Sequence, residues 1–257
     1  MCNKQTGTSH KKEILKMLLA DLPLQINWWQ TCQSTNLTAK EEFLANGYHG
    51  PKLFGSEVQT DGYGKSARPF ISRYGGIYLS LVIKVPQLTG QNQGLLTTGI
   101  AWQLYETIKQ ELQIETELKW VNDLFWQGKK IAGILVESPA PRIAIIGIGC
   151  NLFQAHLSEE LPSATNLLIA QPTTAKTCHL ISNLVHHLFS FIPNFIHSDF
   201  LPQYKKHMML LNKKVTLQLG QTTIQGRAVD LTPMGNLVLE TETGSQSFNA
   251  GEITRIH

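Results

Sequence analysis

Apolar and polar residues alternate along several short stretches of the chain, and this period of two predicts β-strands. The clearest stretch runs from Gly76 to Val85, where every second residue from Ile77 to Ile83 is aliphatic. Gly, Pro, Asn and Ser separate the stretches. Between residues 26 and 151 we predict strands at Ile26–Thr31, Lys52–Gln59, Gly76–Val85, Glu117–Val121, Leu124–Trp126, Lys130–Ser138 and Arg142–Asn151.

Other stretches repeat their apolar residues at the helical spacing of three and four. A cap triplet, Ser34-Thr35-Asn36, begins one of them, and Gly47 ends it after Asn46. The predicted helices are a short one between Lys11 and Leu22, one from the cap triplet to Asn46, and those at Gln91–Leu112, Thr174–Phe191 and Ser198–Leu211.

The pattern changes after Asn212, where short alternating strands follow one another without helices. They cover Val215–Leu219, Thr222–Asp230, Asn236–Glu242 and Gln246–Asn249. About 46 residues are marginal for an independent core, so this module is expected to pack against the larger part of the chain.

The order of the elements predicts an α+β fold with a mixed β-sheet flanked by helices, because hairpin-linked strands mix with helices and no βαβ unit repeats. The predicted organisation is an N-terminal extension with one short helix (1–25), a catalytic domain (26–211) and a small C-terminal β-barrel (212–257).

Composition limits the class of protein. The 257 residues are 42% hydrophobic and 16% charged, with a net charge of +3, and Lys and Arg form no cluster larger than a triplet. This is typical of a globular protein that binds neither nucleic acid nor membrane. The apolar runs are too short to span a bilayer, and Met1–His10 is polar, so a cytoplasmic location is expected. The four cysteines and nine histidines form no metal-binding pattern.

The residues 60–74, here called the glycine loop, are the first candidate for chemistry. Gly62 and Gly64 free the backbone to approach a phosphate, and Lys65 and Arg68 supply positive charge. A P-loop is excluded because Gln59 stands where the motif needs glycine, and Arg68-Pro69 follows where a helix should begin. A flexible surface turn is the alternative interpretation.

Lys130 is the second candidate, since it enters an apolar strand that continues through Gly133. A lysine near apolar surroundings attracts a carboxylate or phosphate strongly. The alternative interpretation is that Lys130 is only the exposed first residue of that strand. Asp123, nearby in the sequence, is a candidate to hold a metal or a ribose. The alternative interpretation is that it caps a turn.

The third candidate is the end of an apolar strand at Gly147, Gly149 and Asn151, where two glycines permit a flat ligand to approach the backbone. Packing or a β-bulge explains these glycines equally well.

In combination, these motifs resemble the biotin protein ligase family from about Trp28 to the C-terminus. Family members carry S-T-N, Q-x-x-G-R-G-R-x-G-R, K-W-P-N-D, K-x-x-G-I-L, G-I-G-x-N and a final G-E pair. The corresponding segments here are Ser34-Thr35-Asn36, the loop from Gln59, Lys119 to Asp123, Lys130 with Gly133-Ile134-Leu135, Gly147 to Asn151, and Gly251-Glu252.

The resemblance implies a catalytic domain related to lipoate ligases and class II aminoacyl-tRNA synthetases, with an SH3-like C-terminal barrel. It implies that ATP, with Mg²⁺ held mainly through the phosphates, activates biotin as biotinyl-adenylate. A lysine of the biotin carboxyl carrier protein of acetyl-CoA carboxylase then takes the biotinyl group, and AMP and pyrophosphate are the other products.

The resemblance also implies roles for individual residues. Lys130, Asp123 and Arg68 are the expected catalytic residues. Biotin is expected to contact Ser34, Thr35, Asn36, Gln59, Gly62, Lys130 and Gly133. The nucleotide is expected to contact Gly64, Lys65, Arg68, Phe70, Asn122, Gly147, Gly149 and Asn151.

The glycine loop departs from the family pattern. Tyr63 and Lys65 replace the first two loop arginines, and Ala67 replaces a glycine. Lysine lacks the bidentate fork of arginine, so a looser hold on the adenylate is expected.

Three further expectations complete the interpretation. About 27 residues precede Trp28, too few for a winged helix-turn-helix, so no repressor function is expected. A lipoate ligase and a non-catalytic biotin-binding protein remain the alternative functions. Either a monomer or a homodimer is compatible with the sequence.

Overall fold

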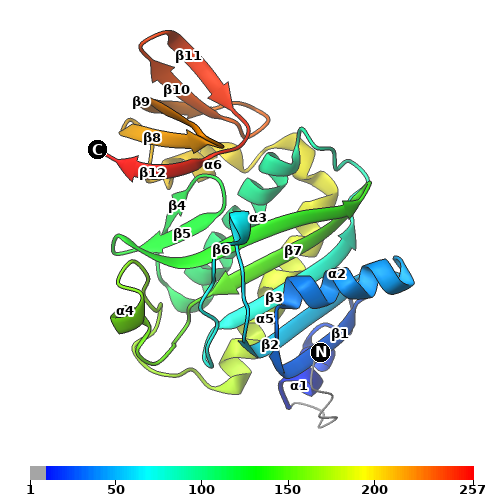
Figure 1. The fold of residues 1–257 in the computed structure, drawn as a ribbon. Coiled ribbons are helices and arrows are strands. Elements are labelled where there is room, and N and C mark those ends of the chain that lie inside the picture. The colour runs from blue at the N-terminus through cyan, green and yellow to red at the C-terminus, as the bar shows by residue number, and fades with distance from the viewer. Residues whose placement is uncertain (1–9) are drawn as a thin grey trace.

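The computed structural model describes residues 10–257, which form a large mixed sheet with helices on both faces and a smaller β-sheet domain beside it (Figure 1). The predictions for residues 1–9 lie outside the described residues. Helix α1 (His10–Leu18) is the short helix predicted before the first strand. The domain boundaries at residues 25 and 211 stay predictions.

The large sheet has seven strands in the order β1-β2-β3-β7-β6-β5-β4. Only β1 and β2 pair in parallel, and all other neighbours are antiparallel, so the predicted mixed sheet is confirmed. The strands are β1 (Gln25–Cys32), β2 (Lys52–Gln59), β3 (Ile77–Lys84), β4 (Glu117–Lys119), β5 (Asp123–Trp126), β6 (Lys129–Ala140) and β7 (Ile143–Cys150).

Alternation along the strands sends side chains to two separate cores. From β3, Leu79, Leu81 and Ile83 join the main core with helices α1, α3 (Gln93–Leu112) and α5 (Thr174–Phe191). Val82 points to the opposite face and meets Ala39 of helix α2 (Thr35–Asn46). Helix α2 therefore covers one face of the sheet, and the other long helices cover the second face (Figure 1).

One predicted helix is wrong in its extent, and one short helix was missed. The helix predicted at Ser198–Leu211 is only α6 (Leu201–Lys206), and the turn η2 (Ile192–His197) precedes it. Beyond it the chain forms a bridge between Met208 and Leu118. The short helix α4 (Leu157–Glu160) was not predicted. Its four residues are too few to show a period.

The C-terminal domain is an antiparallel five-stranded sheet in the order β11-β10-β9-β8-β12, which confirms the predicted β-module. Its strands are β8 (Lys214–Leu219), β9 (Thr222–Leu231), β10 (Leu237–Thr241), β11 (Gly244–Phe248) and β12 (Glu252–Ile256). The last strand was missed, because Ile253 is its only buried residue and the alternation is therefore weak.

Both parts of the molecule contact each other directly. Trp120 Nε1 donates a hydrogen bond of 2.9 Å to the carbonyl of Gly235. Lys65 Nζ donates to the carbonyl of Gly251 at 2.8 Å. The C-terminal domain thus touches the glycine loop, which carries candidate site residues.

A buried carboxylate fastens the N-terminal helix to the sheet. Glu57 is 5% exposed, and its oxygens accept from Trp28 Nε1 at 2.8 Å and Lys11 Nζ at 2.6 Å. We expect Glu57→Ala to lower the free energy of unfolding by about 3 kcal/mol, because it leaves both donors unpaired. Urea unfolding measures the change. Glu57→Gln should cost less, and Glu13→Ala, which removes an exposed pair with Lys16, should cost almost nothing. Equal losses in Glu57→Ala and Glu13→Ala would contradict this.

Candidate functional site

A cavity of about 350 Å³ lies between the start of α2, the glycine loop and strands β6 and β7. Most of the predicted site residues line it together, although they come from distant parts of the sequence. They are Ser34, Thr35, Asn36, Gln59, Gly64, Lys65, Arg68, Phe70, Asn122, Lys130, Gly133, Gly147 and Gly149. The lining also contains Tyr63, Pro69, Leu79, Ile134, Leu135, Ile148, Leu161 and Ser163.

Three predicted residues are outside this lining. Asp123 lies behind Lys130 and forms an ion pair with it at 2.7 Å. Gly62 supports the loop, because a Cβ there would lie 2.6 Å from the Phe70 carbonyl oxygen. The buried side chain of Asn151 accepts a hydrogen bond from Gln154 Nε2 at 2.7 Å and does not line the cavity.

Glycines form the floor of the cavity. A Cβ at Gly147 would lie 2.3 Å from Asn36 Oδ1, and one at Gly149 would lie 2.6 Å from the ring of Phe70. Because these glycines carry no side chain, α2 and the glycine loop approach strand β7 closely, and a ligand can lie directly on the strand backbone.

A chain of side-chain hydrogen bonds, here called the relay, runs beneath the cavity. Thr35 donates through its backbone N–H to Gln59 Oε1 at 2.8 Å, and Gln59 Nε2 donates to Ser72 Oγ at 2.8 Å. The Ser80 hydroxyl lies within hydrogen-bond distance of Thr35 Oγ1 and Asn36 Oδ1 and donates to one of them at a time. The relay residues, in order, are Glu137, Asn36, Ser80, Thr35, Gln59 and Ser72.

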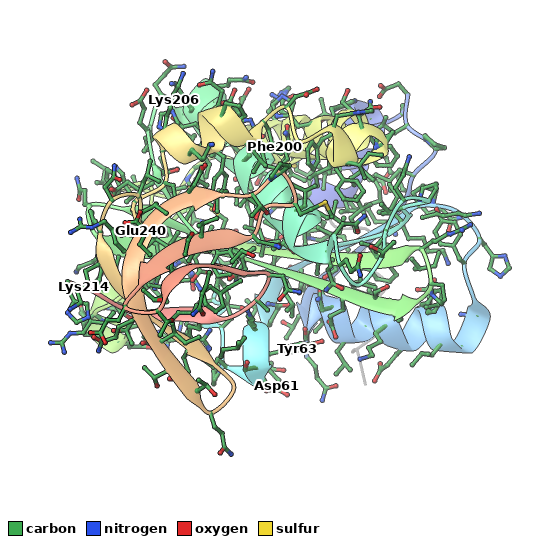
Figure 2. All side chains as sticks on the ribbon, turned by 90° about the horizontal axis from the view of Figure 1, so that it is seen from above. Asp61, Tyr63, Phe200, Lys206, Lys214 and Glu240 are labelled. Carbon is green, nitrogen blue, oxygen red and sulfur yellow. The ribbon has the colours of Figure 1, made fainter. Side chains whose placement is uncertain are left out.

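Both ends of the relay reach the glycine loop. At one end the Ser72 hydroxyl donates to the carbonyl of Phe70 at 2.9 Å. At the other, Glu137 Oε2 accepts from Asn36 Nδ2 at 2.9 Å and from the hydroxyl of Tyr63 at 3.0 Å. The loop is therefore held from two sides, and in Figure 2 its labelled residues Asp61 and Tyr63 lie between α2 and the C-terminal strands.

Tyr63 was noticed in the sequence only as a missing arginine, and the structure gives it a role of its own. Burial, followed by the hydrogen bond to Glu137, raises the pKa of the Tyr63 phenol above its ordinary value. The phenol thus stays protonated and acts as a donor.

Positive charge gathers at the other end of the cavity. Lys130 pairs with Asp123, and Arg68 forms an ion pair with Glu252 of the C-terminal domain. Burial lowers the pKa of Lys65 and of Lys119 below the ordinary lysine value. Partly buried cations attract an anion strongly, so this end suits a phosphate or carboxylate.

The described residues contain no cluster of three or more His, Cys, Asp or Glu side chains that could hold a metal ion. Cys32, Cys150 and Cys178 are buried outside the cavity lining, and burial raises the pKa of Cys150 to about 12. Cysteine chemistry is therefore not part of this site. No helix in residues 10–257 is long and apolar enough to cross a membrane.

Two family models match the chain. The biotin/lipoate A/B protein ligase family matches residues 28–151, and the biotin protein ligase C terminal domain matches residues 210–255. The first match covers the glycine loop and the cavity floor, and the second covers the C-terminal sheet. The fold and the site thus define a ligase of the biotin and lipoate class.

Individual relatives narrow this class. The bifunctional ligase/repressor BirA of Bacillus spizizenii is 28% identical over 97% of this chain and 80% of its own length. The biotin--[acetyl-CoA-carboxylase] ligase of Mycobacterium tuberculosis is 27% identical over 84% of each chain. The structure of the Aquifex aeolicus biotin protein ligase in complex with biotin and ATP is 26% identical, with a TM-score of 0.77, and the match covers 91% of this chain and 99% of that one.

This chain belongs to the biotin protein ligase family, as its motifs indicate, and its enzyme class is that of the biotin ligases.

The Tyr63 hydroxyl should control how often the glycine loop opens. A hydrogen bond to a charged group contributes about 1.5 to 3 kcal/mol, so we expect Tyr63→Phe to speed tryptic cleavage after Lys65 by roughly tenfold or more. Tyr74→Phe, at a residue that is 54% exposed, is the matched control and should leave the rate unchanged. If both variants are cleaved at the wild-type rate, Glu137 does not hold the loop through Tyr63.

Proposed function

We propose that this protein activates biotin with ATP as biotinyl-adenylate and transfers the biotinyl group to a lysine of the biotin carboxyl carrier protein of acetyl-CoA carboxylase. The observation that carries the proposal is the single cavity with a neutral hydrogen-bonding end and a cationic end, with Lys130 in its lining. The relatives named above, one crystallised with biotin and ATP, support the same substrates.

The neutral end suits the ureido ring of biotin. Gln59 is fixed by its bonds to Thr35 and Ser72, and the side chain of Ser34 caps α2 by accepting from the backbone of Leu37. Such fixed amides and hydroxyls recognise a polar, uncharged ring. A ligand that lacks hydrogen-bonding groups would leave the amides and hydroxyls of the protein unpaired. Asn36 belongs to the same wall, and Gly62 and Gly133 give the ligand room.

Lys130 would act in the first step. A carboxylate oxygen of biotin attacks the α-phosphorus of ATP, the new P–O bond forms, and the bond to the bridging oxygen breaks as pyrophosphate leaves. The ammonium of Lys130 stabilises the charge that develops on the phosphate, and Asp123 orients that ammonium. Both reactants are held together in one cavity, which lowers the entropic cost of the reaction.

The remaining residues would hold the nucleotide. Gly64, Lys65 and Arg68 contact phosphates, while Phe70, Asn122, Gly147 and Gly149 line the space for adenosine. Asn151 is not proposed as a direct ligand, because its side chain bonds to Gln154. Asp123 is already paired with Lys130, and the described residues contain no cluster of metal-ligating side chains. Mg²⁺ would therefore be held mainly by the phosphates of ATP.

In the second step the lysine of the carrier protein attacks the acyl carbon of the adenylate, and AMP leaves. No covalent intermediate with the protein is needed. The absence of a repressor role stays a prediction.

The first test is biotin- and ATP-dependent labelling of a biotin carboxyl carrier domain. We expect Lys130→Ala to reduce labelling by about 10²- to 10³-fold, the usual loss when one donor to a developing charge is removed. Lys129→Ala, at the exposed neighbouring residue, is the matched control and should label normally. Lipoate serves as the control acid.

Each other outcome has a definite meaning. Tight biotin binding without labelling or ATP-dependent pyrophosphate release identifies a biotin-binding protein. Labelling by lipoate in place of biotin keeps the fold and changes the substrate. Full labelling by Lys130→Ala removes that residue from the mechanism.

The second test concerns the departures in the glycine loop. Lysine at position 65 cannot form the bidentate contact of arginine, so the adenylate should leave more readily than it does in Lys65→Arg. The measurement is the rate at which labelled biotinyl-adenylate is released from the protein without a carrier. Equal rates for the wild type and Lys65→Arg would refute this explanation.

A further inference from the structure

A second cavity, of about 280 Å³, adjoins the first one. Its walls come from the start of α3, the middle of β6 and the C-terminal domain. The two cavities share Lys65, Asn122, Ile134 and Leu135. The second cavity is further lined by Gly90, Gln93, Gly94, Thr97, Val121, Val136, Asn249 and Ala250. The two cavities therefore lie next to each other along the four shared residues.

The walls of this second cavity are fixed by close contacts between the two domains. A Cβ at Gly94 would lie 3.2 Å from the Asn249 carbonyl oxygen, and one at Gly235 would lie 3.1 Å from Leu95 Cα. A side chain at either glycine would require its neighbour in the other domain to shift. Asn249 and Ala250 are thereby held opposite the catalytic domain, and the cavity exists only where the two domains meet.

The charge of the lining selects the kind of occupant. Lys65 is its only charged side chain, and no carboxylate lines it among the described residues. A triphosphate with several negative charges would meet one cation, and a cationic group would meet no counter-charge. A neutral group is therefore the best fit to the charge of the lining, and the neutral amine is the reactive form of lysine.

We propose that the second cavity admits the acceptor lysine of the carrier protein and delivers its neutral amine to the biotinyl-adenylate. This inference rests on the proposed function and extends it by assigning the acceptor a separate entrance. The four-carbon stem of lysine can cross this cavity, whose lining includes Ala250 and the β6 residues Ile134, Leu135 and Val136. Desolvation in the cavity and the charge of Lys65 both favour loss of the ammonium proton.

Asn122 marks the junction, since it lines both cavities. Its Nδ2 donates to the carbonyl of Ile134 at 3.1 Å, which leaves Oδ1 as an acceptor for the N–H of the incoming amine. The amine nitrogen attacks the acyl carbon, the amide C–N bond forms, and the bond between the acyl carbon and the phosphate oxygen breaks. AMP leaves with the electron pair, and the surplus amine proton passes to water.

The test separates the two half-reactions. Ala250→Phe fills the cavity from the C-terminal domain, and Gly90→Phe fills it from the opposite wall, where a Cβ meets nothing within 4 Å. Both positions are exposed, so folding should be preserved. We expect transfer to the carrier domain to fall by about a hundredfold, as for a misplaced reactant. Biotin-dependent exchange of pyrophosphate into ATP should be unchanged, as should trapping of the adenylate by hydroxylamine, a small nucleophile.

Ser245→Phe adds the same ring to an exposed residue of β11 that does not line the second cavity, and it should transfer normally. Normal carrier labelling by both cavity-filling variants would overturn the inference while leaving the proposed function intact. Loss of pyrophosphate exchange in both variants, with Ser245→Phe active, would show that the cavity serves the nucleotide and would also overturn it. Failure of the wild type to exchange pyrophosphate or label the carrier would refute the proposed function itself.

Discussion

The start of helix α2 lies so close to strand β7 that only glycine fits beneath it, and the geometry of the site follows from this contact. A Cβ at Gly147 would lie 2.3 Å from Asn36 Oδ1. At this depth Asn36 reaches Ser80, and the preceding residue Thr35 meets Gln59 with both its N–H and its hydroxyl. Asn36, Ser80 and Thr35 are buried, Gln59 is half-buried, and all four are paired, so each fixes the next. A methyl group added at Gly147 would push Asn36 away from β7 and so displace the end of the cavity that suits a neutral ring.

At the cationic end, the charges already have partners within the protein. Lys130 pairs with Asp123, Lys65 donates to the carbonyl of Gly251, and Arg68 pairs with Glu252. Because Arg68 and Glu252 are both partly exposed, their pair contributes about 1 kcal/mol or less and can be exchanged for a phosphate at little cost. The C-terminal domain thus holds the glycine loop through Lys65 and Arg68.

Local pattern was enough to predict most strands and the helix capped by Ser34, whereas the resemblance to the biotin protein ligase family implied most of the residues that line the cavity. Local pattern failed where a residue depends on a partner far along the chain. Tyr63 and Glu137 are 74 positions apart, and no periodicity links a loop tyrosine to a strand carboxylate. Strand β12 was not predicted for a similar reason. It is defined by its pairing with β8, and its own alternation does not mark it as a strand. The motif that contains Asn151 likewise gives no sign of its hydrogen bond with Gln154.

The C-terminal domain is marginal in size for an independent fold, and we interpret it as part of the proposed reaction site. Its residues Asn249 and Ala250 complete the second cavity, which the catalytic domain alone would leave open to solvent. Lys65 lines both cavities, so its charge acts on both occupants. Under the proposed function, a phosphate in the first cavity would offset part of that charge, and the remaining charge would favour the neutral form of an amine in the second cavity. One shared residue would thus act on both half-reactions.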